Sequence, residues 1–116
     1  MNQTTEERVA AARARLGELR EKCIERTHGE LATMRQSLAQ LQGGESAELG
    51  EIVRLAHRMS GTGATLGLDA LGEQAQRVEK LAESLSSAAI DAGARRTLTA
   101  AIESLAAELA RVQSSR

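Results

Sequence analysis

The segment LAHRMSGTGATLGL, residues 55–68, separates two stretches of sequence in which apolar residues recur every three or four positions. The first series of apolar positions runs into the segment and consists of Leu49, Ile52, Val53, Ala56 and Met59. The second begins at the last residue of the segment and consists of Leu68, Leu71, Ala75, Val78, Ala82 and Leu85. Spacing of this kind places the residues on one face of an α-helix. The segment therefore lies where two amphipathic helices meet, and we expect helices over about residues 46–62 and 68–85.

The N-terminal third carries the longest pattern. Thr4 or Thr5 can cap a helix with an acidic first turn. The apolar positions then form two series with a one-residue shift between them: Val9, Ala12, Leu16, Leu19, Cys23, followed by Ile24, Thr27, Leu31, Met34, Leu38, Leu41. We expect one helix over about residues 5–42, with Gly29 marking where a kink or break would fall and Gly43-Gly44 ending it.

The C-terminal part predicts a fourth helix over about residues 91–113, with Leu98, Ile102, Leu105, Leu109 and Val112 facing inward. The 116 residues contain no Pro and no aromatic residue and are rich in good helix formers. We therefore expect a single all-α domain over residues 1–116, an antiparallel up-down four-helix bundle. Its first helix is longer than the others and should overhang the bundle or cap its end.

Composition also excludes several functions. The formal net charge of −1 gives no basic face for nucleic acid, and the lack of aromatic residues removes any platform for stacking bases. No apolar run approaches the roughly 20 residues of a membrane span, and the polar N-terminus is unlike a signal peptide. Because the lone Cys23 cannot form an internal disulfide, we expect a cytoplasmic protein.

His57 is the candidate functional residue. On a helical wheel it lies roughly 80–100° from the centre of the apolar stripe, at the boundary between core and solvent. Gly61 follows one turn later, and a glycine inside a helix, which is unfavourable, would leave the imidazole open to a partner. Arg54 and Arg58 flank the histidine and could attract a phosphoryl oxygen. A neutral imidazole is a good nitrogen nucleophile at neutral pH.

The run from Leu55 to Gly61, followed by Leu66-Gly67-Leu68 and the stripe after it, resembles the histidine phosphotransfer (HPt) domains of multistep phosphorelays. Gly61 and Gly67 match the two glycines of the family pattern. The resemblance implies that His57 is exposed on the second helix of a four-helix bundle and accepts a phosphoryl group from the aspartate of a receiver domain. The implied partners are response-regulator receiver domains and a hybrid sensor kinase, for a monomeric carrier that is not itself an enzyme. It needs no cofactor or metal of its own.

One position departs from the family pattern. The family usually has a lysine three residues after the histidine, and this chain has Ser60 there. A hydroxyl is neutral, so we expect Arg54 or Arg58 to take over the attraction of the phosphoryl group. For the docking of a receiver we expect Gly61 and Ala64 at the centre of the contact and Gln74 and Arg77 at its rim.

Two other functions remain open at the level of sequence. A degenerate phosphotransfer domain would bind a receiver or kinase without carrying phosphate, and Ser60 favours this alternative. A helical scaffold would use its long first helix as a coiled-coil handle and would be indifferent to His57. Away from this region, His28 lies in a polar stretch without a motif, Cys23 is expected in the core, and no two of the His and Cys residues share a metal-ligand spacing.

Overall fold

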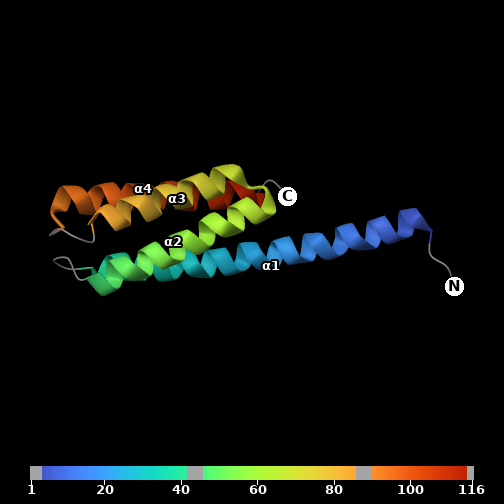
Figure 1. The fold of residues 1–116 in the computed structure, drawn as a ribbon, viewed down its shortest axis with the longest axis horizontal. Coiled ribbons are helices and arrows are strands. Elements are labelled where there is room, and N and C mark those ends of the chain that lie inside the picture. The colour runs from blue at the N-terminus through green and yellow to red at the C-terminus, as the bar shows by residue number, and fades with distance from the viewer. Residues whose placement is uncertain (1–3, 42–45, 86–89, 115–116) are drawn as a thin grey trace.

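The computed structural model describes residues 4–41, 46–85 and 90–114, and these residues form four α-helices and no strand. The helices are α1 (Thr5–Gln40), α2 (Ser46–Leu66), α3 (Asp69–Leu85) and α4 (Ala92–Ser114). Consecutive helices run in opposite directions (Figure 1). The all-α four-helix bundle expected from the sequence is confirmed, and none of the described helices is long and apolar enough to cross a membrane.

α1 is one continuous helix, so no break occurs at Gly29. It begins with a capping box, in which the Thr4 hydroxyl accepts from the Glu7 amide while the Glu7 carboxylate accepts from the Thr4 amide. It ends at Gln40, two residues before the predicted end, because Leu41 leaves the helix and is fully buried. Arg95 of α4 donates to the carbonyls of Leu38 and Leu41 at this helix end, and the Leu38 carbonyl also accepts from the Leu41 amide. The predicted Gly43-Gly44 end lies outside the described residues.

The predicted end of α2 at residue 62 is wrong, because the helix continues to Leu66. Gly67 terminates it in the left-handed conformation, with φ of 70°. The Leu68 amide donates to the Gly63 carbonyl at 2.8 Å and the Gly67 amide to the Ala64 carbonyl at 3.3 Å, which is the Schellman pattern. The glycines at 61 and 63 are tolerated inside the helix, and the second of them has a packing role described below.

The predicted starts of α3 and α4 each differ from the observed ones by one residue, since these helices begin at Asp69 and Ala92. At α4 the reason is a cap: the Asp91 carboxylate accepts from the Ala94 amide at 2.7 Å, so Asp91 precedes the helix. α4 also ends one residue later than predicted, at Ser114. The helix boundaries predicted from apolar spacing are otherwise close to those observed.

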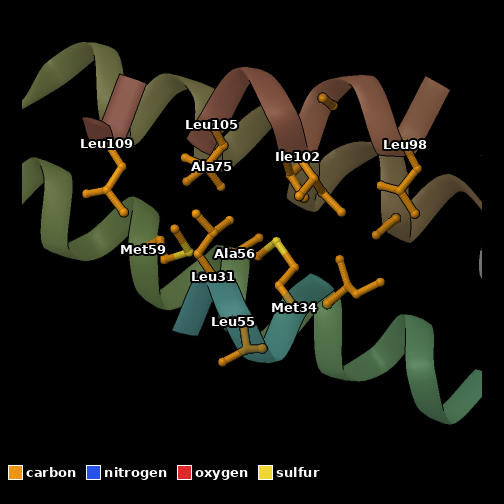
Figure 2. Packing of buried hydrophobic residues seen from close by; sticks show 14 of the residues in the cluster. Leu31, Met34, Leu55, Ala56, Met59, Ala75, Leu98, Ile102, Leu105 and Leu109 are labelled. Carbon is orange, nitrogen blue, oxygen red and sulfur yellow. The ribbon is translucent and has the colours of Figure 1, made fainter. Parts of the chain in front are cut away.

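One apolar core joins the four helices (Figure 2). α1 contributes Leu31 and Met34, α2 contributes Leu55, Ala56 and Met59, and α3 and α4 contribute the rest of the residues that Figure 2 labels: Ala75, Leu98, Ile102, Leu105 and Leu109. Met59 is fully buried. Among the helix pairs that are in contact, α2 and α3 have the most extensive contact and α1 and α4 the least. The helix that carries His57 is thus held firmly against the helix after it.

The core does not extend along the whole of α1. Its first buried residue is Ile24, whereas Val9, Leu16 and Leu19 are 43%, 65% and 56% exposed. Figure 1 shows the blue N-terminal half of α1 projecting past the ends of the other helices. The radius of gyration is 17.5 Å, against about 13 Å for a compact chain of this length. The expected overhang is therefore confirmed, and it leaves the large apolar residues of the first series of α1 exposed.

Candidate functional site

The imidazole of His57 stands on the exposed side of α2 and is oriented by a carboxylate of α3. The side chain is 76% exposed, and its Nδ1 lies 3.0 Å from Oε2 of Glu79. A carboxylate can only accept a hydrogen bond, so the pair holds the proton on Nδ1 and leaves the lone pair on Nε2. The arrangement presents a nucleophilic nitrogen to solvent in a fixed tautomer.

Glu79 is the functional residue that the sequence did not single out. It is separated from His57 by 22 positions and sits on another helix. Its side chain is only 17% exposed, against 76% for the side chain of His57. Its position directly after the buried Val78 indicates the edge of a helix face, but only the packing of α3 on α2 shows which residue it meets.

Both predicted phosphate helpers already have carboxylate partners. Arg54 makes two hydrogen bonds to Glu51, of 3.0 and 2.7 Å. The hydrogen bond from Arg54 is the main reason that the pKa of Glu51 lies below its usual value. Arg58 is directed toward α1, where its Nε lies 3.0 Å from Oε2 of the buried Glu30. Among the hydrogen bonds and ion pairs of the described residues, neither guanidinium is paired with His57. Each arginine would therefore have to leave its carboxylate, or bind it and the phosphoryl group together.

Shallow grooves flank the exposed ridge of α2 on both sides. The groove toward α1 is lined by Cys23, Arg26, Arg58, Gly61, Thr62, Thr65 and Leu66. Within it Arg26 donates to the Thr62 hydroxyl at 3.2 Å. The groove toward α3 is lined by Ser60, Ala64, Asp69, Gly72, Glu73 and Gln76. The α1-side groove is thus basic and the α3-side groove acidic, with His57 on the ridge that separates them.

Glycine is present at positions 61 and 63 for different physical reasons. A Cβ on Gly63 would lie 2.6 Å from the Gly72 amide nitrogen, so this glycine lets α2 and α3 approach backbone to backbone. A Cβ on Gly61 would meet no atom of the chain within 4 Å. Internal packing therefore does not require Gly61, and its lack of a side chain keeps the surface beside His57 low.

The predicted docking residues do not all gather around His57. Gly61 and Ala64 are exposed one and two turns after it, on the same side of α2. Gln74 is half-buried with its amide oxygen shielded from solvent, and on the wheel it lies roughly 140° from Glu79. Arg77 is exposed and lines an adjacent hollow, which shares Glu73 and Gln76 with the α3-side groove. Gln76 and Glu73 occupy the rim positions next to Ser60 and Ala64 instead.

The remaining candidates lie apart from His57. Cys23 is half-buried and lines the α1-side groove, so its predicted place in the core is wrong. His28 is half-buried on α1. Among the described residues, no group of three or more His, Cys, Asp or Glu side chains is arranged to hold a metal ion.

Fold and site together define an all-α bundle domain that displays one oriented imidazole nucleophile on its second helix. The chain belongs to the Hpt domain family, whose model matches residues 18–115. Membership implies phosphotransfer in histidine–aspartate phosphorelays, in which Hpt domains generally serve as phosphocarriers and interact with receiver domains and kinases. No curated protein and no solved structure matches the chain.

Proposed function

We propose that this chain carries a phosphoryl group on Nε2 of His57 and exchanges it with the aspartate of receiver domains. The observation that carries the proposal is the pairing of an exposed imidazole with Glu79, which leaves Nε2 as the nucleophilic nitrogen. His57 is also the histidine that the family resemblance selects. Together with the lone cysteine, this role predicts a cytoplasmic monomer.

In the accepting step, the Nε2 lone pair attacks the phosphorus of an aspartyl phosphate. The new N–P bond forms as the acyl P–O bond breaks, and the receiver's carboxylate leaves with the electron pair. No proton has to move, because Nδ1 keeps its hydrogen and the imidazolium charge that develops is balanced by Glu79. Donation to a second receiver is the reverse sequence. The receiver supplies its own divalent cation and the rest of the catalytic machinery.

The two grooves support an orientation for this step. A phosphoryl group is anionic, so the acidic α3-side groove repels it and the basic α1-side groove attracts it. Arg58 borders the attractive side, and Ser60 borders the repulsive one. We infer that Arg58 compensates for the missing lysine more effectively than Ser60 does, by sharing its charge between Glu30 and the incoming phosphoryl group.

For the docking face we propose Gly61 and Ala64 at the centre, as the sequence suggested. We revise the rim from Gln74 and Arg77 to Glu73 and Gln76, which line the groove beside Ala64. Small central residues let a partner come close to the imidazole, and polar rim residues provide specificity.

A transfer assay with a matched histidine control tests the proposal. The chain is incubated with a receiver domain phosphorylated on its aspartate, and the carrier is examined for an acid-labile, base-stable phosphoryl group. His57→Gln should abolish labelling, while His28→Gln should label like the parent. NMR of the labelled protein should locate phosphorus on Nε2. Equal labelling of His57→Gln and the parent would overturn the proposal.

One observation favours a second candidate. With Ser60 in place of the usual lysine, and with both neighbouring arginines held by carboxylates, the chain could bind a receiver without accepting phosphate. Binding to several receivers without any labelling of His57 would support this non-carrying function over the first.

A further inference from the structure

The overhanging part of α1 carries an exposed seam of apolar residues. Val9, Ala12, Leu16, Leu19 and Cys23 recur at alternating steps of three and four, the spacing of a coiled-coil seam. The seam is about 22 Å long at the rise of an α-helix. Leu16 and Leu19 are more than half exposed. These residues begin before residue 18, where the match to the Hpt domain family starts, so the seam is largely additional to the family's fold.

Every position that flanks the seam between Val9 and Cys23 is basic. In a heptad that begins at Val9, the positions next to the seam are Arg13, Arg15, Arg20 and Lys22. Among the ion pairs of the described residues, none involves Arg13 or Arg15. The acidic residues Glu18 and Glu25 lie away from the seam on the helix surface. The surface is therefore an apolar line between two rows of positive charge.

These flanks disfavour a second copy of the chain as the occupant. Flanking residues face one another across a two-helix seam in either orientation. Arg15 would meet Arg20 of the second copy in a parallel pair, and Arg15 or Lys22 would meet basic residues in an antiparallel one. Like charges across such a seam destabilise the pair.

The shape of the molecule disfavours a membrane surface. By rotation along the helix, the seam points within roughly 60° of the face of α1 that the bundle covers. The other helices therefore end beside the start of the overhang and form a step on the side toward which the seam points (Figure 1). A flat bilayer cannot follow the seam without meeting it, whereas a helix of about 10 Å diameter fits into the step. The seam is also narrow and has no aromatic anchor, unlike helices that lie in membrane interfaces.

We propose that the seam binds a single amphipathic helix of a partner protein, with apolar residues along its contact line and Asp or Glu on both flanks. Apolar contact would provide stability, and the carboxylates would pair with Arg13, Arg15, Arg20 and Lys22 to select the partner. The seam ends at Cys23, which lines the α1-side groove next to Gly61. A helix bound there lies beside the His57 face, although the inference does not depend on phosphotransfer.

Model peptides, tested against the full chain, show whether the seam prefers a helix with acidic flanks to one with basic flanks. The probe is a fluorescent helix of about 28 residues with Ile and Leu on its seam and Glu at every flanking position. A second peptide carries Lys at those positions. The chain should bind the Glu peptide at least about tenfold more tightly than the Lys peptide, and binding should weaken as NaCl rises from about 0.05 to about 0.5 M. Leu16→Glu should abolish the binding.

Charge reversal provides the decisive control. Arg13→Glu with Arg15→Glu should remove most of the preference for the Glu peptide, because two basic flanks remain against two acidic ones. Adding Arg20→Glu with Lys22→Glu should invert the preference toward the Lys peptide, which no loss of folding could produce. Lys80→Glu with Arg96→Glu, a change of charge equal to that of the first pair but elsewhere on the surface, should leave the preference intact, as should His57→Gln. Equal affinity for both peptides would overturn the proposal. A dimer detected by sedimentation that Leu16→Glu dissociates would also overturn it, because a second copy would then occupy the seam. Binding to phosphatidylglycerol vesicles without binding to the Glu peptide would overturn it in favour of a membrane surface.

Discussion

At the scale of single residues, Glu79 determines which nitrogen of His57 is available. An isolated imidazole exchanges between two tautomers, and the carboxylate 3.0 Å from Nδ1 selects one of them. Glu79 is a positioning residue, since it acts on the phosphoryl group only through the ring.

Replacing Glu79 by Gln should slow phosphoryl transfer about tenfold, because a hydrogen bond to a charged group contributes about 1.5 kcal/mol. The measurement is single-turnover transfer from a phosphorylated receiver, accompanied by ¹⁵N chemical shifts of the His57 ring. The shifts should report a larger fraction of the other tautomer. A slower rate with unchanged shifts would contradict the positioning role. Gln76→Ala, in the α3-side groove, is the control for an effect on receiver binding alone.

Ser60 provides the second prediction at this scale. Ser60→Lys would place a positive charge beside the imidazole and should speed acceptance by up to about fivefold, the kinetic equivalent of about 1 kcal/mol. The gain should shrink as salt is added, because the contact is screened. A rate that does not change at any salt concentration would show that Arg58 already provides the charge. Thr33→Lys on the exposed surface of α1 controls for a general effect of net charge.

At the scale of helices, some glycines are required by the packing or the end of a helix, whereas Gly61 is not. Gly63 and Gly72 bring α2 against α3, while Gly61 meets nothing in the chain. Gly67 ends α2 with a positive φ. Of the two glycines in the family pattern, therefore, only Gly67 has a structural reason within this molecule.

A series of Gly→Ala changes should separate these roles in urea unfolding. Gly63→Ala should cost about 1–3 kcal/mol, because its Cβ meets backbone atoms that cannot move aside. Gly61→Ala should instead add up to about 1 kcal/mol of stability, since alanine favours the helix. Gly61→Leu should also fold but transfer phosphate more slowly, because it covers the approach to His57. Gly61→Leu with the parent's transfer rate would show that no partner needs this space.

At the scale of the whole molecule, the buried core that stabilises the fold and the overhang of α1 that lengthens the molecule are formed by different parts of the chain. The buried residues begin at Ile24, and the preceding turns of α1 contribute length without core. Leu105 is fully buried among the four helices, whereas Leu16 is 65% exposed.

Leu16→Glu should therefore change the free energy of unfolding by no more than about 0.5 kcal/mol. Leu105→Ala should cost about 2–5 kcal/mol, because it leaves a cavity in the core. Urea denaturation followed by circular dichroism gives both values. A large cost for Leu16→Glu would mean that the overhang is not an independent extension, and it would also remove the basis of the seam proposal.

The sequence by itself determined the elements and the candidate histidine. Apolar residues at steps of three and four specify helices whatever surrounds them, and the family resemblance of residues 55–68 selected His57. The end of α2 was misplaced, because helix propensity penalises Gly61 and Gly63, whereas in the structure the contact of Gly63 with Gly72 and the cap at Gly67 stabilise the helix to Leu66. Contacts between helices are the part that only the tertiary structure decided. The pairing of Glu79 with His57, the diversion of Arg58 to Glu30 and the exposure of the seam depend on how the helices are rotated against one another, and that rotation is set by packing over the whole core rather than by any local pattern.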